Sequence, residues 1–129
     1  MLLLYNSQLS KKCKVCATIK LTQQFNKSCK PRGDGYSSYC KACDSARRIA
    51  YKLKISIDEY FRYLNQRPKL CEICKARDRK LCLDHNHETG KIRGWLCYGC
   101  NINLEYDYKF EHHTMYVYTR RYLEKYDTV

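Results

Sequence analysis

Eight cysteines arranged as four CxxC pairs constrain the fold of this chain more than any other feature of its sequence. They form two sets of two pairs, with 23 residues between the pairs of the first set and 22 in the second: Cys13, Cys16, Cys40 and Cys43, then Cys71, Cys74, Cys97 and Cys100. Each set matches a four-cysteine zinc site, in which two CxxC turns bring soft thiolates to one ion. A redox pair is the alternative for one isolated CxxC, and four pairs in two matched sets disfavour it. Four protein ligands leave no open position on the metal, so the sequence predicts two structural Zn²⁺ ions.

The size of the chain agrees with a fold that depends on metal. Its 129 residues allow one domain or two very small ones, with a core too small to fold comfortably without such staples. The opening Met-Leu-Leu-Leu-Tyr is too short for a signal-peptide core, and no run approaches the roughly 20 apolar residues of a membrane span. We therefore expect a cytoplasmic protein with reduced thiols and no membrane partner.

Positive charge is concentrated in the N-terminal part of the chain. The formal net charge is +12, and residues 11–54 contain 12 Lys and Arg but only two acidic residues. Two four-thiolate zinc sites would lower the total to about +8, which still favours a polyanion. A solvated surface that keeps the protein soluble is the alternative. The asymmetry predicts nucleic acid as the partner of this region.

The order of the motifs predicts four segments. Residues 1–54 form a four-cysteine zinc module and a basic helix that bind DNA, and the first ten of them are an unanchored lead. Residues 55–68 form a connecting helix, residues 69–110 the second zinc module, and residues 111–129 a C-terminal helix whose Met and Tyr stripe is more typical of core than of interface.

Local signals give the expected helix starts and the first DNA-binding residues. Asp44 is a candidate N-cap for the basic helix, and Ser56 and Glu59 match a capping box that opens the connecting helix. The basic helix carries the side chains that we expect to contact phosphates: Arg47, Arg48, Lys52 and Lys54.

The residues with catalytic chemistry lie between the two CxxC pairs of the second set. Leu81 to Leu83 and Ile92 to Leu96 read as two strands joined by a turn, and we expect a helix that begins at Asn101. Asp and Asn side chains supply the oxygen ligands that Mg²⁺ prefers, and a neutral imidazole can take a proton from water. The segment therefore predicts metal-assisted phosphodiester hydrolysis.

The stretch LDHNHETGKIRGWLCYGCN closely resembles the phage recombination endonuclease VII family, which belongs to the HNH or His-Me finger nucleases. The resemblance is strong over residues 71–101. It implies a small, zinc-stapled α+β protein in which a ββα-metal (His-Me finger) nuclease core follows a zinc-ribbon-like module and a basic helix. It also implies a DNA endonuclease, located in the host cytoplasm if the protein is phage-encoded.

Carried over position by position, the resemblance implies one catalytic Mg²⁺ or Mn²⁺ bound by Asp84 and Asn101. His85 would be the general base of a one-metal mechanism. His87 matches a family position near the scissile phosphate, and Arg93 would contact the DNA backbone. Cys71, Cys74, Cys97 and Cys100 would hold the structural zinc.

Two features depart from family members that resolve Holliday junctions. Those members carry an acidic residue a few positions after the Asn, whereas this chain has Leu104 there and Glu105 one position later. The long C-terminal helical region through which such resolvases dimerise is largely missing. Double-stranded and branched DNA both stay open as substrates, as do resolving, homing, restriction-like and packaging roles. Cutting both strands needs two active sites, which favours a homodimer.

Each candidate residue also has a non-catalytic interpretation. Asp84 and His85 could be a pair at a strand end, His87 a spare zinc ligand and Asn101 a simple helix cap. The alternative function is then a zinc-dependent nucleic-acid-binding module without catalysis.

Overall fold

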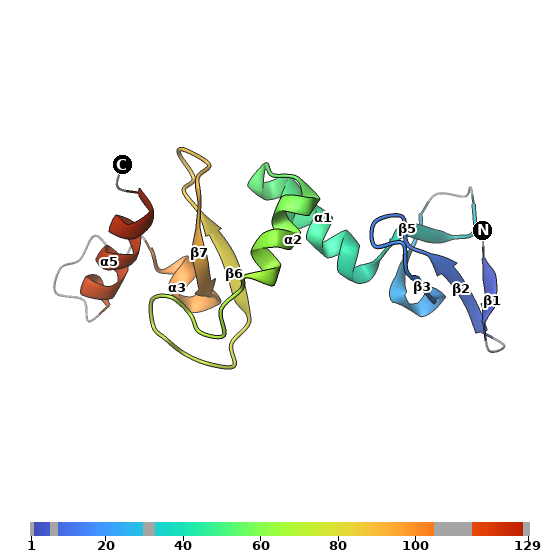
Figure 1. Ribbon diagram of the computed structural model, residues 1–129, viewed down its shortest axis with the longest axis horizontal. Coiled ribbons are helices and arrows are strands. Elements are labelled where there is room, and N and C mark those ends of the chain that lie inside the picture. The colour runs from blue at the N-terminus through green and yellow to red at the C-terminus, as the bar shows by residue number, and fades with distance from the viewer. Residues whose placement is uncertain (1, 6–7, 30–32, 105–114, 128–129) are drawn as a thin grey trace. The chain divides into compact units, whose positions relative to one another are not determined.

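The computed structural model describes residues 2–5, 8–29, 33–104 and 115–127 (Figure 1). The chain divides into two compact units, Met1–Phe61 and Arg62–Val129, and each contains one set of four cysteines. Short antiparallel strands and helices occur in both, so the predicted small α+β class with two four-cysteine clusters is confirmed. Within the described residues, no helix has the length and apolar character that crossing a membrane requires.

The first unit is built from two small antiparallel sheets and a helix. Its elements are β1 (Leu3–Tyr5), β2 (Gln8–Lys12), β3 (Ile19–Leu21), a 3₁₀ turn (Thr22–Gln24), β4 (Phe25–Lys27), β5 (Tyr36–Cys40) and α1 (Lys41–Leu53). Strands β1, β2 and β3 form one sheet in that order, and β4 pairs with β5. The expectation of an unanchored lead is therefore wrong, because β2 pairs on both sides and buries Ser10.

Helix α1 begins four residues earlier than its sequence suggests. Cys40 is the N-cap, with an extended backbone, and Asp44 lies in the first turn instead of capping it. The prediction of Asp44 as the N-cap is wrong because the second CxxC pair spans the end of β5 and the start of α1. The helix ends at Lys54, which adopts the left-handed conformation common at helix C-termini.

Helix α2 (Ile57–Asn65) begins as the sequence predicts. The Ser56 hydroxyl accepts a hydrogen bond from the Glu59 backbone N–H at 3.1 Å, which is half of a capping box. The helix ends before Arg67-Pro68, where proline disfavours helical geometry in the residue before it.

The second unit has one hairpin followed by a short helix. Its elements are β6 (Leu81–His85), β7 (Ile92–Cys97), α3 (Tyr98–Ile102) and α5 (Tyr116–Asp127), and α5 packs beside β7 (Figure 1). Both predicted strands are present. The expected helix start at Asn101 is wrong, since Cys97 is the N-cap and Asn101 is the fourth residue of α3.

The two units repeat one local plan. In each unit the first CxxC pair, Cys13–Cys16 or Cys71–Cys74, forms a tight turn that we call the knuckle, and a hairpin follows it. The first cysteine of the second pair ends the hairpin and is the N-cap of a helix. Ala17 and Lys75, which directly follow the knuckle pairs, both adopt left-handed backbone with φ of 56° and 59°. Each donates its N–H at 3.0 Å to the carbonyl of the first knuckle cysteine, Cys13 or Cys71. The cysteine spacing therefore encodes a knuckle–ββα arrangement twice.

Candidate functional site

Both cysteine sets converge as a tetrahedral metal site requires. Within each set the four Sγ atoms lie within 4.8 Å of one another. Zn–S bonds of about 2.3 Å place tetrahedral sulfurs about 3.8 Å apart. The Sγ atoms of Cys74 and Cys97 are 3.8 Å apart. The two clusters could therefore hold zinc, with all eight predicted ligands in place.

Local hydrogen bonds stabilise the thiolate form of Cys13 in the first cluster. Burial acts to raise the pKa of Cys13, but backbone N–H groups, including those of Cys40 and Val15, outweigh it and lower that pKa to about 6. The Lys20 ammonium lies 3.3 Å from the Cys40 Sγ, and this contact raises the pKa of the lysine. A deprotonated cysteine is the form that binds metal.

A β-bulge directs Asp84 into the interior of the second unit. Leu83 faces Trp95 and His85 faces Ile92, so the register shifts between them. Alternation along a strand would expose Asp84 beside a buried Leu83, yet both side chains are buried and Asp84 is only 3% exposed. Bulges next to functional sites commonly redirect one side chain in this way.

One hydrogen bond and one ion pair hold the buried carboxylate of Asp84. The Tyr122 hydroxyl, from α5, donates to Oδ2 at 2.9 Å and accepts from the Gly94 N–H at 2.8 Å. The Arg93 Nε lies 2.8 Å from the same oxygen. Burial, followed by the Asp84 charge, raises the pKa of Tyr122 far above its ordinary value, so the hydroxyl stays a donor at neutral pH.

The other carboxylate oxygen of Asp84, Oδ1, has one weak contact in the described part of the chain. Asp84 Oδ1 has a contact of 3.5 Å with the Arg93 Nη2, too long for a strong hydrogen bond. Asp84 and Asn101 line the same pocket, which has a volume of about 720 Å³ and also includes His87. Carboxylate and amide oxygens are hard ligands, so this donor set fits a Mg²⁺ or Mn²⁺ ion.

The histidines of the motif lie together at the end of β6. The rings of His85 and His87 stack with centroids 4.6 Å apart. Burial and, second, the neighbouring His87 lower the pKa of His85. A neutral imidazole, able to accept a proton, is therefore favoured at neutral pH.

The hairpin of β6 and β7 is shaped by its turn, which contains Gly90, and by Gly94 in β7. The Asn86 side chain accepts backbone N–H bonds from Glu88 and Thr89, and Gly90 has a φ of 76°. At Gly94, any β-carbon would collide with the Glu72 carboxylate and crowd the Tyr126 hydroxyl. The G-K-x-R-G segment thus combines a turn glycine with a close-packing glycine.

Arg93 is engaged within the chain, whereas the sequence suggested a DNA contact. Its guanidinium pairs with Asp84, pairs with Asp127 at 2.8 Å and donates to the His85 carbonyl at 3.0 Å. Its side chain is 9% exposed. Arg93 therefore balances the Asp84 charge and ties both strands to α5.

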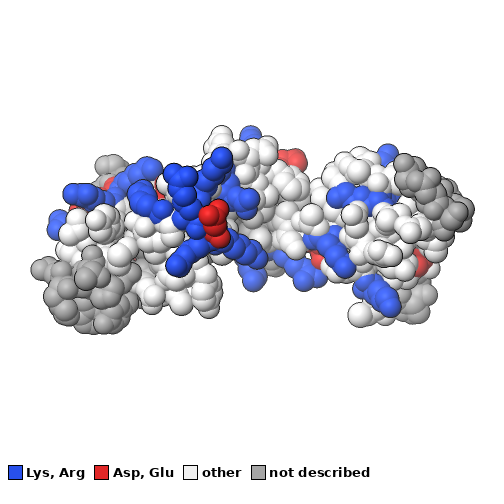
Figure 2. Space-filling model, turned by 90° about the horizontal axis from the view of Figure 1, so that it is seen from below, with Lys and Arg blue, Asp and Glu red and all other residues white. Residues whose placement is uncertain are grey.

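The four predicted DNA-binding residues of the basic helix are all exposed. Lys52 and Lys54 are exposed, and Arg47 and Arg48 lie on α1 with ion pairs to Asp44. Figure 2 shows a face of the molecule on which Lys and Arg side chains far outnumber acidic ones. Leu104 is buried, and Glu105 lies outside the described residues.

Sequence reasoning missed two residues that organise the site. Tyr122 belongs to the predicted stripe, but the stripe did not indicate its bond to Asp84; it is buried, whereas Tyr118 is 52% exposed. Glu72, inside a CxxC pair, accepts from the Trp95 N–H at 2.6 Å and the Tyr126 hydroxyl at 2.7 Å. Neither contact has a local sequence signal, because each joins residues more than 20 positions apart.

Comparison with known proteins gives matches at three levels. The family profile described as Recombination endonuclease VII matches residues 45–124. The Gene 59 protein of Mycobacterium phage L5 is 37% identical over 57 residues, covering 42% of this chain and 35% of the relative. The Gene 59 protein of Mycobacterium phage D29 is 33% identical over 57 residues, covering 42% and 34%. The chain thus spans about a third of the length of these curated relatives.

Among solved structures, the chain is similar to the ββα-Me type II restriction endonuclease Hpy99I. The identity is 24% and the TM-score 0.33, with 90% of this chain and 65% of that chain covered.

Proposed function

The chain belongs to the recombination endonuclease VII family, whose profile matches more than half of it, and from this membership we propose that it is a metal-dependent DNA endonuclease. The observation that carries the proposal is the pocket shared by Asp84 and Asn101, with His85 at the end of the same strand as Asp84. Its substrate is double-stranded or branched DNA, and cleavage of both strands would require a homodimer.

The proposed mechanism assigns one task to each side chain. Asp84 and Asn101 hold a Mg²⁺ or Mn²⁺ ion, which when bound supplies electrostatic stabilisation of the charge that develops at the scissile phosphate. His85 accepts a proton from the attacking water, in keeping with its lowered pKa. His87 lines the pocket and contacts the phosphate.

The surrounding residues keep this arrangement rigid. Tyr122 and Arg93 orient Asp84 through Oδ2 and leave Oδ1 for the metal. Two structural zinc ions, one per cysteine cluster, hold each knuckle against its hairpin and helix. Arg47, Arg48, Lys52 and Lys54 contact DNA phosphates, which positions the duplex without reading its sequence.

A cleavage assay tests the proposal. The protein is incubated at low salt with supercoiled plasmid and with a synthetic four-way junction, with Mg²⁺ present or omitted, beside His85→Ala. We expect Mg²⁺-dependent cutting by the native chain and a loss of about 100-fold or more in His85→Ala, the range that general bases contribute. The relative rates on the two substrates separate general nicking from junction resolution.

Two results would overturn the proposal. Cutting that persists unchanged in His85→Ala would remove His85 as the base. DNA binding by a zinc-loaded protein that cuts neither substrate, nor a library of randomised sites, would favour the alternative, a non-catalytic zinc-dependent nucleic-acid-binding module.

A further inference from the structure

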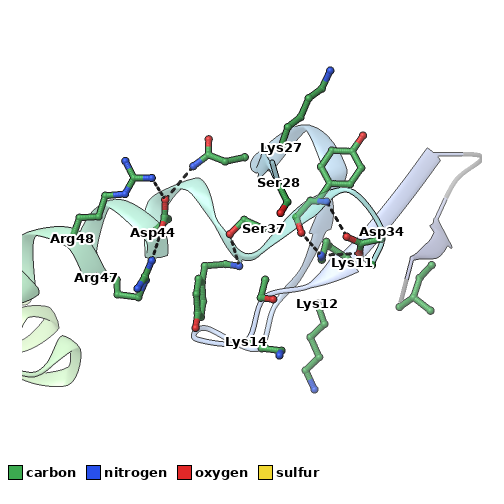
Figure 3. Close-up of a pocket in the computed structure, with 16 residues that line it drawn as sticks. Lys11, Lys12, Lys14, Lys27, Ser28, Asp34, Ser37, Asp44, Arg47 and Arg48 are labelled. Carbon is green, nitrogen blue, oxygen red and sulfur yellow. Dashed lines mark hydrogen bonds and ion pairs between the residues drawn. The ribbon is translucent and has the colours of Figure 1, made fainter. Parts of the chain in front are cut away.

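A second pocket lies within the first unit, on the face formed by β2, β4, β5 and the start of α1. Its volume is about 860 Å³. Six of its lining side chains are cationic and two are acidic: Lys11, Lys12, Lys14, Lys27, Arg47 and Arg48, with Asp34 and Asp44 (Figure 3). We call it the basic groove.

The two acids of the basic groove are already neutralised inside it. Asp34 pairs with the buried Lys11 at 2.7 Å, and this contact lowers the pKa of Asp34. Asp44 is 5% exposed and pairs with Arg47 at 3.1 Å and Arg48 at 2.8 Å (Figure 3). The acids therefore hold part of the groove in shape and leave a positive surplus.

That surplus rests mainly on three exposed lysines. Lys12, Lys14 and Lys27 come from β2, the first knuckle and β4, and within the described part of the chain no acidic group pairs with them. Figure 3 shows Lys12 and Lys27 extending in opposite directions, away from Asp34 and Asp44. Ser28 and Ser37 add hydroxyl groups to the same lining. Ammonium and hydroxyl groups around a concave surface are the donors that phosphate oxygens accept from.

The basic groove occupies the same place in the repeated plan as the candidate active site. Asp44 follows Cys43 directly and lines the groove, as Asn101 follows Cys100 and lines the second pocket. The first unit, however, contains no histidine, since all four histidines of the chain lie after residue 84. The groove is therefore lined by cations and has no candidate base.

From this contrast we propose that the basic groove is a non-catalytic site that binds the phosphodiester backbone of DNA, with Lys12, Lys14 and Lys27 as its principal contacts. The proposal rests on the proposed nuclease function and extends it. It gives the DNA substrate a second binding site, in the unit that carries no candidate catalytic residue. Its binding is electrostatic and independent of base sequence.

DNA binding by the zinc-loaded chain of 129 residues tests the groove. The measurement uses fluorescence anisotropy with a labelled duplex, in the His85→Ala background without Mg²⁺, over a series of salt concentrations. The test variant is Lys12→Gln, Lys14→Gln, Lys27→Gln. The control, Lys41→Gln, Lys69→Gln, Lys80→Gln, removes the same charge from exposed lysines outside both pockets.

We expect the groove variant to bind DNA about tenfold or more weakly than the native chain. The slope of the logarithm of the binding constant against the logarithm of the salt concentration should fall in magnitude by about 2 to 3, because each lost phosphate contact lowers it by about 0.9. The control should change affinity less than about threefold, and arginine at the three groove positions should restore binding. Equal losses in groove and control variants would overturn the proposal, as would tighter binding of the groove site to RNA than to DNA. Because no cutting is required, this result is separate from failure of the nuclease proposal, which the cleavage assay reports.

Discussion

At the scale of single residues, the environment of Asp84 explains how a buried carboxylate can serve a metal site. An isolated buried carboxylate is strongly disfavoured, so it needs partners in the absence of metal. Arg93 and Tyr122 supply them on one oxygen, at 2.8 and 2.9 Å. The Asp84, His85 and Asn101 pattern could be read from sequence because these residues lie in one short motif. Tyr122 could not, because its bond to Asp84 joins residues 38 positions apart.

Tyr122→Phe should therefore weaken both the fold and the proposed metal site. Hydrogen bonds to charged groups contribute about 1.5–3 kcal/mol, so the free energy of unfolding should fall by about that amount. We also expect a higher Mg²⁺ concentration for half-maximal cleavage, measured by titration.

Tyr126→Phe is the matched control for this substitution. Its hydroxyl donates to a carboxylate in the same unit, but that carboxylate belongs to Glu72. It should lower stability to a similar extent and leave the Mg²⁺ requirement unchanged. An identical Mg²⁺ titration for native protein and Tyr122→Phe would contradict the positioning role.

At the scale of elements, two helices begin at positions that their sequences did not predict. The sequence indicated Asp44 as the N-cap of α1 and Asn101 as the first residue of α3, yet the N-cap of α1 lies four residues before Asp44 and α3 begins three residues before Asn101. The physical reason is the same in both units: the second CxxC pair spans the end of a strand and the first helical turn, so its first cysteine, Cys40 or Cys97, becomes the N-cap. The start of α2 has no cysteines, and there the capping signal at Ser56 gave the right answer.

Glu72 joins the second knuckle to β7 and α5, so we expect its loss to lower the free energy of unfolding. Its carboxylate accepts from the backbone of β7 and from Tyr126 and Lys125 of α5. Glu72→Ala leaves the Trp95 N–H without its acceptor, and a buried unsatisfied donor costs about 1–3 kcal/mol. We expect a drop of that size in chemical denaturation.

Glu72→Gln separates the lost hydrogen bond from the lost charge. Its amide oxygen can still accept from the Trp95 N–H, so most of the stability should return. Equal destabilisation by both substitutions would instead assign the effect to the ion pair with Lys125.

At the scale of the whole molecule, we expect stability to depend on zinc in the two cysteine clusters more than on an apolar core. The fully buried side chains include Cys13, Cys40 and Cys71, and one buried cluster of the first unit consists of three cysteines and Phe25, with four partly buried hydrophobic residues packed against it. Zinc binding contributes about 10–16 kcal/mol in zinc-finger peptides, which exceeds the stability of a typical domain. The spacing of the cysteines predicts this dependence, whereas the shared knuckle–ββα plan of both units could be seen only from the backbone.

Removal of zinc should therefore unfold the chain. We expect two zinc ions per chain by elemental analysis, and loss of the far-ultraviolet circular dichroism signal and of DNA binding when a chelator removes them. Added Zn²⁺ should restore both signals. A metal-free chain that still unfolds cooperatively would contradict this dependence.

The central claim is that His85 takes the proton from water in a site completed by Asp84 and Asn101. Single-turnover cleavage by His85→Gly, with and without added imidazole, tests it most directly, with Asn101→Ala measured in parallel. The account predicts that His85→Gly loses about 100-fold or more in rate, that imidazole restores part of this loss, and that imidazole does not help Asn101→Ala. Cleavage by His85→Gly at the native rate, or equal effects of imidazole on both variants, would contradict it.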